Sequence, residues 1–219
     1  MSSSSTALWY ASRATGVVCL LLFTAVILLG LLVSRQGKLP GLPKFGVVHL
    51  HRYLSLLGIA FLAIHVLTAV ADSYVNISLA AAIIPFVSKY QPFWLGLGAV
   101  SIDLMIAIIV TSLVRSRINR RTWRLVHWLA YACWPIAIAH SIGAGPDVRH
   151  GPLLWLTLAC TATVAVAIAV RTAASQRTPA PDTQIRQLLA DQSTQLQPAR
   201  GDDPPRPSRI QNQTEAAYR

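Results

Sequence analysis

Residues 47–71 read VVHLHRYLSLLGIAFLAIHVLTAVA, and this stretch decides the class of fold. It is long enough to span a membrane, because about 20 helical residues cross a hydrocarbon core of about 30 Å. It nevertheless carries His51, Arg52 and His65. Ionisable residues within a membrane helix are costly and usually functional, so the stretch predicts a transmembrane helix that does more than anchor the chain.

Four further apolar runs lie on either side of this stretch. The five expected spans are Thr15–Val33, Val47–Ala71, Trp94–Val114, Trp123–Ile142 and Leu153–Val170. The first is too long and too uniformly apolar for a signal peptide and lacks a small-residue cleavage site, so we expect it to remain as a helix. The sequence therefore predicts an all-α membrane protein, a bundle of five transmembrane helices in contact with lipid.

Composition supports this class. Of the 219 residues 53% are hydrophobic and 12% charged, and the net charge is +11. The basic residues fall between the apolar runs, which is the pattern of membrane loops and not of a nucleic-acid groove, so we expect no nucleic-acid partner. Cys19, Cys133 and Cys160 all lie inside apolar runs, which predicts small buried residues and argues against a disulfide framework or a zinc site.

The basic residues also predict the direction of the chain. Those expected on one side are Arg35, Lys38, Lys44, Arg52, Arg115, Arg117, Arg120, Arg121, Arg124 and Arg171, against Arg13, Lys89 and Arg149 on the other. Because cytoplasmic loops carry the excess of Lys and Arg, we expect the N-terminus outside and the C-terminus in the cytoplasm of a multi-pass inner (plasma) membrane protein.

This topology divides the chain into three parts. Residues 1–13 form an N-terminal extracytoplasmic segment, residues 14–171 the transmembrane domain, and residues 172–219 a Pro- and Gln-rich cytoplasmic tail that is expected to be disordered. The loop Asp72–Phe93 is long and half apolar, and we expect part of it to lie along the outer interface.

Four of the six histidines form two matched pairs in only two of the expected helices. His51 and His127 lie near the inner face, and His65 and His140 lie nearer the outer face. Their separations of 14 and 13 residues correspond to axial steps of about 21 and 19.5 Å in an α-helix. Two histidine pairs at two matched depths are therefore expected.

Such pairs indicate haem. A haem plane fills the gap between two facing imidazoles, takes one nitrogen on each face and packs against apolar side chains. With both axial positions occupied by protein, the iron has no open site for oxygen and passes electrons instead. Two such centres would form a relay across the bilayer.

The angular positions of the histidines around the helix axis support the haem interpretation for one helix only. His51 and His65 share a face, whereas thirteen residues of regular helix fall roughly 140° short of whole turns and point His127 and His140 apart. Pro135 lies between the latter two, and we expect a kink or local unwinding there to turn His140 toward the same interface.

Arginines near the histidines are candidates for haem propionates. Arg52 and Arg124 suit the inner pair, and Arg13 or Arg149 the outer pair. For the remaining arginines, Arg115, Arg117, Arg120 and Arg121, the topology rule is a sufficient explanation. His49 is expected at the interface and His150 in an outer loop.

Asp103, in the middle of the third span, leaves alternatives open. It could be a neutral acid hydrogen-bonded to a neighbouring helix, an ion-paired structural residue or a proton-handling group. The four histidines could also be separate polar residues that hydrogen-bond between helices. A different class of function is a haem-free transporter or proton relay that uses the intramembrane histidines together with Asp103.

Three motifs resemble the ferric reductase-like transmembrane domain family. They are Leu50-His51-Arg52 with His65 fourteen residues after His51, Thr111-Ser112-Leu113 before the Arg-rich loop, and WRLVHWLAY at 123–131 with His140 thirteen residues after His127. The family includes the membrane portions of NADPH oxidases, eukaryotic ferric reductases and the haem b membrane subunit of the bacterial methionine sulfoxide reductase system. The resemblance covers about residues 9–170.

The resemblance implies that His51 and His127 bind an inner haem b, and that His65 and His140 bind an outer haem b. It also implies electron flow from a cytoplasmic or membrane donor to an extracytoplasmic acceptor. Larger members append a flavin and nicotinamide module, but this sequence shows no phosphate-binding glycine motif. We therefore expect an oxidoreductase component that is served by a separate flavoprotein or by quinol.

Overall fold

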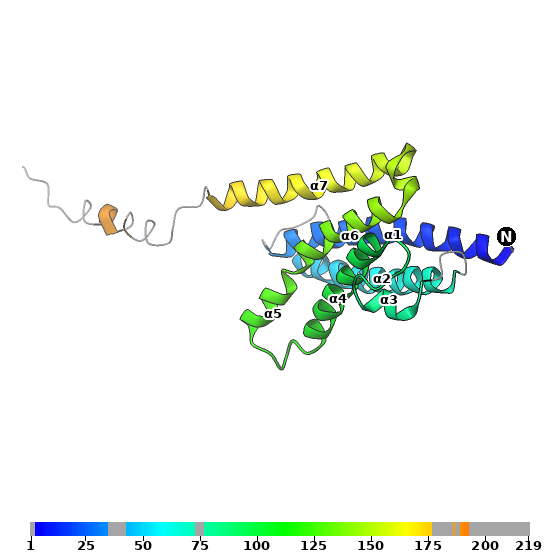
Figure 1. Cartoon of the computed structure of the whole chain (residues 1–219). Coiled ribbons are helices and arrows are strands. Elements are labelled where there is room, and N and C mark those ends of the chain that lie inside the picture. Colours follow the sequence, from blue (N-terminus) through cyan, green and yellow to red (C-terminus); the bar gives the residue numbers. More distant parts are fainter. Residues whose placement is uncertain (1–2, 35–42, 73–76, 177–185, 187–188, 193–219) are drawn as a thin grey trace, which may run out of the picture. The chain divides into compact units, whose positions relative to one another are not determined.

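The regular structure of this chain is helical. A computed structural model describes residues 3–34, 43–72, 77–176, 186 and 189–192, and the regular elements in these ranges are all helices (Figure 1). They are α1 (Ser3–Ser34), α2 (Lys44–Ala71), α3 (Leu79–Ile83), α4 (Pro92–Leu113), α5 (Arg120–His127), α6 (Ala130–Ala144), a short 3₁₀ helix η1 (Pro146–Arg149) and α7 (Gly151–Gln176).

Within the described residues, five helical segments are long and apolar enough to cross a membrane. Their ranges are Thr6–Ser34, Phe45–Ala71, Pro92–Leu113, Arg120–Ala144 and Gly151–Ala173. They coincide with the five spans that hydropathy predicts, so the prediction of an all-α membrane protein with five spans is confirmed. α1 begins at Ser3, so it takes in most of the segment 1–13 that we expected before the first span. The direction of the chain across the membrane stays a prediction.

The fourth span is not one regular helix. α5 ends at His127 and α6 begins at Ala130, and the turn between them is Trp128 and Leu129. In this turn the backbone N–H groups of Leu129 and Tyr131 donate to carbonyls three residues earlier, at 2.9 and 3.0 Å, which is the tighter 3₁₀ pattern. α6 then continues through Pro135. An interruption is therefore present in this span, but it follows His127 directly, and the kink expected at Pro135 stays a prediction.

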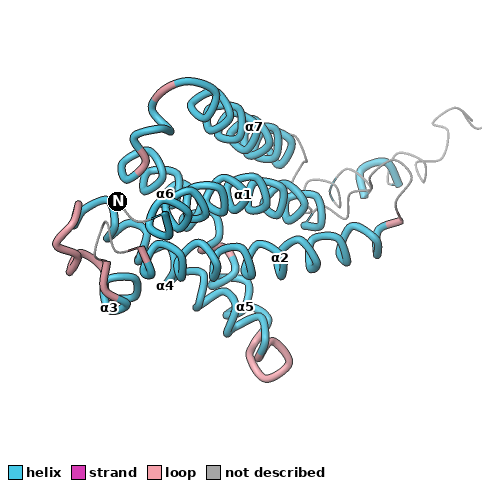
Figure 2. Tube along the Cα trace, turned by 90° about the vertical axis from the view of Figure 1, so that its right-hand side faces the viewer, coloured by secondary structure: helices cyan, strands magenta, loops and turns pink. Residues whose placement is uncertain are grey.

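The helices pack in a definite order within Met1–Arg171, which forms one unit of the chain. α1 packs closely along α2, and α4 along α6. α1 lies between α2 and α7 (Figure 2). A buried cluster joins α1, α6 and α7 through the side chains of Ile27, Leu31, Trp134, Ile138, Cys160 and Val164.

Polar side chains inside the spans bond to their own helices. The hydroxyls of Thr24, Ser101 and Thr157 donate to carbonyls four residues earlier, at 2.7, 3.0 and 2.9 Å. The thiol of Cys133 in α6 contacts the carbonyl of Ser101 in α4 at 3.4 Å. All three cysteines are free and buried, as predicted. Such pairing is required in lipid, where water cannot satisfy a polar group.

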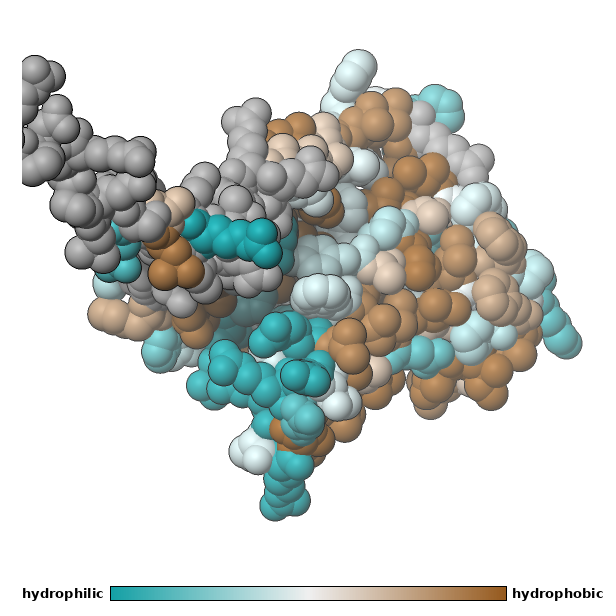
Figure 3. All heavy atoms as spheres, turned by 90° about the vertical axis from the view of Figure 1, so that its left-hand side faces the viewer, coloured by the Kyte–Doolittle hydropathy of each residue, from teal (hydrophilic) through white to brown (hydrophobic). Residues whose placement is uncertain are grey.

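The outer surface of the spans is apolar. Large hydrophobic side chains on every span are exposed, among them Tyr10, Leu67, Leu113, Leu129 and Trp155. Hydrophobic residues cover wide areas of the surface in Figure 3, while hydrophilic residues gather in one part of it. An exposed apolar surface of this extent belongs in contact with lipid.

The connections expected outside the spans are only partly described. The loop expected at Asp72–Phe93 contains the short helix α3, whose N-cap Ser78 accepts a hydrogen bond from the N–H of Ala81 at 3.2 Å. Residues 172–176 continue α7, and residues 186 and 189–192 are helical. Most of the expected disordered tail lies outside the described residues.

Candidate functional site

A single cavity brings the four intramembrane histidines together. It has a volume of about 1650 Å³ and lies between helices of the unit Met1–Arg171. His51, His65, His127 and His140 all line it. A site for one small molecule typically has about 300–1,000 Å³, so this cavity is larger than such a site.

The inner pair, His51 and His127, has the spacing of ligands on one iron. The centres of their rings are 6.4 Å apart, and the ring planes differ by 68°. Two imidazoles that bind one metal ion from opposite sides, each at about 2 Å, have ring centres roughly 6 Å apart. α5 and α2 therefore present His127 and His51 at a separation that suits bis-histidine ligation.

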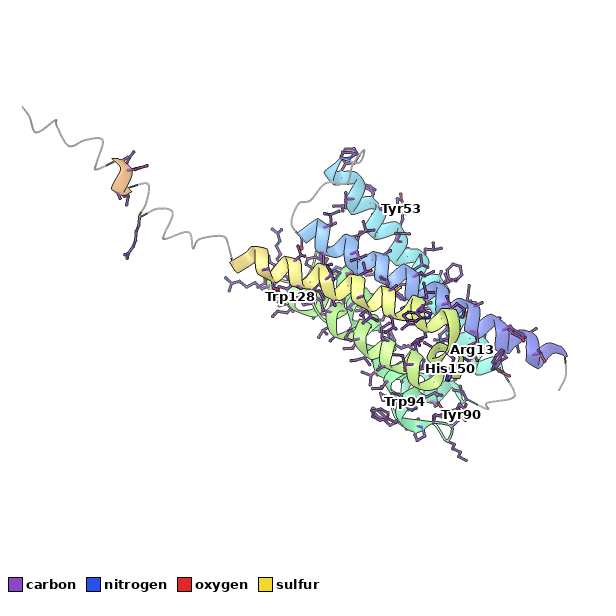
Figure 4. All side chains as sticks on the ribbon, turned by 90° about the horizontal axis from the view of Figure 1, so that it is seen from above. Arg13, Tyr53, Tyr90, Trp94, Trp128 and His150 are labelled. Carbon is purple, nitrogen blue, oxygen red and sulfur yellow. The ribbon has the colours of Figure 1, made fainter. Side chains whose placement is uncertain are left out.

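The outer pair is held by backbone carbonyls of other helices. Nδ1 of His65 in α2 donates to the carbonyl of Ser12 in α1 at 2.8 Å, and Nδ1 of His140 in α6 donates to the carbonyl of Trp94 in α4 at 2.8 Å. Figure 4 shows Trp94 toward the same end of the helices as Arg13, with Trp128 toward the opposite end, which separates the two pairs in depth.

These hydrogen bonds also fix the tautomer of the histidines. His51 makes the same kind of bond, from Nδ1 to the carbonyl of Val26 in α1 at 3.1 Å. Because a carbonyl oxygen can only accept, Nδ1 must carry the proton in each case. The lone pair is then on Nε2, the nitrogen available to a metal ion, and donation from Nδ1 makes it more basic.

His127 is held differently. Its ring stacks on Trp123, one turn earlier in α5, with ring centres 5.0 Å apart and planes 23° from parallel. Its Nδ1 is buried and has no hydrogen-bond partner among the described residues. The guanidinium of Arg115 lies 5.5 Å from the centre of the Trp123 ring. Sequence reasoning missed Trp123, although its spacing of four residues from His127 could have pointed to the contact.

Arginines line the cavity in larger number than expected. Arg52 and Arg124, proposed for the inner propionates, both line it. Arg115 and Arg120 do so as well, although the topology rule seemed sufficient to explain them. Arg13 lines the cavity and forms an ion pair with Asp147 at 2.9 Å, so part of its charge is already compensated. The side chain of Arg149 lies outside the described part.

Other polar candidates lie away from the cavity. His49, His150 and Asp103 are exposed and do not line it. Among the described residues no group of three or more His, Cys, Asp or Glu side chains could hold a metal ion. Two imidazoles per metal suffice only when a cofactor supplies the other ligands, as porphyrin does for iron. The residues present therefore fit haem.

The fold defines a multi-pass helical membrane protein, and its cavity is lined by four histidines. The family model described as "Ferric reductase like transmembrane component" matches residues 15–138, and the chain belongs to this family. The resemblance inferred from the histidine motifs is thus confirmed. Membership indicates a transmembrane oxidoreductase component that transfers electrons, and the family typically binds haem. A search of curated proteins and a search of solved structures gave no match.

Proposed function

We propose that this chain carries single electrons across the membrane through two b haems. His51 and His127 bind the inner haem, and His65 and His140 bind the outer haem. The observation that carries this proposal is the convergence of all four imidazoles, from α2, α5 and α6, on one cavity of about 1650 Å³.

Each haem, when bound, supplies an iron that changes between the ferric and ferrous states and so carries one electron. The protein supplies neutral imidazole nitrogens whose orientation is set by hydrogen bonds or stacking. Apolar side chains such as Val17, Ile59 and Met105 line the cavity and exclude water. The guanidinium groups of Arg52 and Arg124 offer charge-assisted hydrogen bonds to the propionates of the inner haem.

The direction of transfer follows from the proposed topology. We propose that a separate flavoprotein or quinol donates electrons at the cytoplasmic end and that an extracytoplasmic acceptor receives them. Support comes from the arginines, because Arg115 and Arg120 line the cavity near the inner pair and raise the positive potential where an anionic donor would approach. A fluorescent reporter fused to the C-terminus should be active, and a periplasmic phosphatase fused there inactive. The reverse result would reject the topology.

Absorbance of the detergent-purified protein tests the proposal directly. We expect a dithionite-reduced spectrum of b haem and two haems per chain. His65→Ala and His140→Ala should each remove the outer haem and leave the inner one. His49→Ala is the matched control, because His49 is exposed and does not line the cavity. A folded, colourless wild-type protein would reject the proposal.

The haem-free proton relay has less support. It required the intramembrane histidines to act together with Asp103, but Asp103 is exposed on α4 and does not line the cavity that holds the histidines. In addition, three of the four Nδ1 atoms are bonded to helix carbonyls, which cannot pass on a proton.

A further inference from the structure

Three glycines lie against the histidines that are anchored to backbone carbonyls. A Cβ added at Gly16 would lie 3.1 Å from Cε1 of His65, and one at Gly98 would lie 2.8 Å from both Cε1 and Nδ1 of His140. At Gly30, an added Cβ would lie 3.4 Å from Cε1 of His51. Each of these three imidazoles therefore packs against a glycine of a neighbouring helix, where no side chain intervenes.

Each glycine lies four residues after the carbonyl that accepts the hydrogen bond from the histidine. The carbonyl of Ser12 accepts from His65 and lies four residues before Gly16. The carbonyl of Val26 accepts from His51 and lies four residues before Gly30. The carbonyl of Trp94 accepts from His140 and lies four residues before Gly98. The same arrangement thus occurs three times, on two different helices.

Helix geometry explains this register. In an α-helix the N–H of a residue bonds to the carbonyl four residues earlier, and its Cα–Cβ bond tilts toward the N-terminus, so its side chain covers the preceding turn. Without a Cβ the carbonyl remains accessible and can accept a second hydrogen bond from outside the helix. Glycine is less favourable than alanine inside a helix, so its repetition at this position points to a role for the missing side chain.

The spacing along α1 matches that along α2. Gly16 and Gly30 are 14 residues apart, as are His51 and His65, and the first glycine faces the second histidine. α1 and α2 pack along each other, so one helix can receive both histidines of the other. His127 is the exception, because no described glycine contacts it, its Nδ1 has no partner among the described residues and it stacks on Trp123 instead.

We propose that Gly16, Gly30 and Gly98 are positioning residues for the haem ligands. Gly16 and Gly98 leave little room for a Cβ beside His65 and His140, whereas Gly30 excludes only side chains larger than alanine beside His51. The uncovered helix carbonyl then accepts from Nδ1 of the histidine, so that Nε2 is presented to iron. Gly16 and Gly98 therefore serve the outer haem from two different helices, whereas Gly30 serves the inner haem. This inference rests on the proposed function and adds residues that bind no iron themselves.

Alanine substitutions test the proposal in the full-length, haem-containing protein. The readouts are the haem content and the low-temperature electron paramagnetic resonance signals of the two ferric haems. The variants His51→Ala and His65→Ala assign these signals to the inner and the outer site. Gly98→Ala should abolish the low-spin signal of the outer haem, because its Cβ would lie 2.8 Å from the imidazole. Gly16→Ala should weaken the same signal, and Gly30→Ala, at an ordinary contact of 3.4 Å, should change little. The larger Gly30→Val should disturb the inner haem alone.

Gly58→Ala is the matched control. Its added Cβ would lie 3.1 Å from the ring of Phe23, the same distance as at Gly16, but the ring it meets is not a ligand. Both haems should keep their low-spin signals in this variant.

Reduction potentials give a second measurement. Where a variant of Gly16, Gly30 or Gly98 retains its haem, the reduction potential of that haem alone should shift upward, because weaker donation from Nδ1 makes the ligand less basic.

The outcomes separate the inference from the proposed function. A wild-type protein without haem would overturn both. A wild-type protein with two haems, of which neither responds to Gly98→Ala, Gly16→Ala or Gly30→Val, would overturn the inference alone. Equal loss of both haems in Gly16→Ala and in Gly58→Ala would also overturn it, because the glycines would then be general packing residues.

Discussion

Trp123 gives the sharpest test of how the inner haem is held. Stacking on Trp123, with ring centres 5.0 Å apart, is the contact that orients His127, whose Nδ1 has no hydrogen-bond partner among the described residues. We expect Trp123→Leu to remove this stacking and to leave the apolar wall of the cavity largely in place. His127 would then sample other rotamers, and the inner haem would bind less tightly.

The size of the effect follows from the stacking energy. An aromatic pair contributes about 0.5–1.5 kcal/mol beyond the area that it buries. Since about 1.4 kcal/mol corresponds to a factor of ten in affinity, the inner haem should bind about 2- to 13-fold more weakly. The outer haem should not change, because the imidazoles of His65 and His140 are anchored on helix carbonyls.

Transfer of haem to excess apomyoglobin, followed by absorbance, measures this difference. The inner haem of Trp123→Leu should leave first, while Trp155→Leu should behave as the wild type because Trp155 is exposed on α7 and does not line the cavity. Equal rates for Trp123→Leu and the wild type would refute the role of stacking. Equal acceleration of both haems would show a general loss of packing instead.

Two further changes probe the surroundings of the site. Asp103→Asn should leave both haem spectra and the rate of electron transfer unchanged, because Asp103 is exposed and outside the cavity; a large loss of transfer would show that Asp103 takes part in electron transfer and would contradict this expectation. Asn119→Ala should loosen α5, because the Asn119 side chain caps that helix by accepting from the N–H of Arg121 at 3.0 Å, and loss of such a cap costs about 1 kcal/mol. Faster hydrogen exchange should be confined to the amides of α5, and Asn119→Asp, which keeps the cap, should restore the wild-type rate; unchanged exchange in Asn119→Ala would contradict the capping role.

Hydropathy and residue spacing were sufficient for the class of fold and for the choice of candidate ligands. The five apolar runs predict the five spans because lipid imposes one length and one composition on every crossing helix. The phase argument also identified a genuine difficulty at His127 and His140. It pointed to Pro135, because proline is the strongest local signal for a break. It did not predict the 3₁₀ turn at Trp128 and Leu129, which no single residue type in the sequence indicates.

By itself the sequence determined that the chain is a five-span helical membrane protein and which four histidines are candidates for metal ligands, since both depend on local order along the chain. Only the tertiary structure decided which partners hold those histidines. The carbonyls of Ser12, Val26 and Trp94 belong to helices far from the histidines in sequence. Because every residue type has a backbone carbonyl, the sequence cannot show which one accepts the hydrogen bond. The glycines that uncover these carbonyls gained their meaning only when packing brought α1 against α2, and α4 against α6.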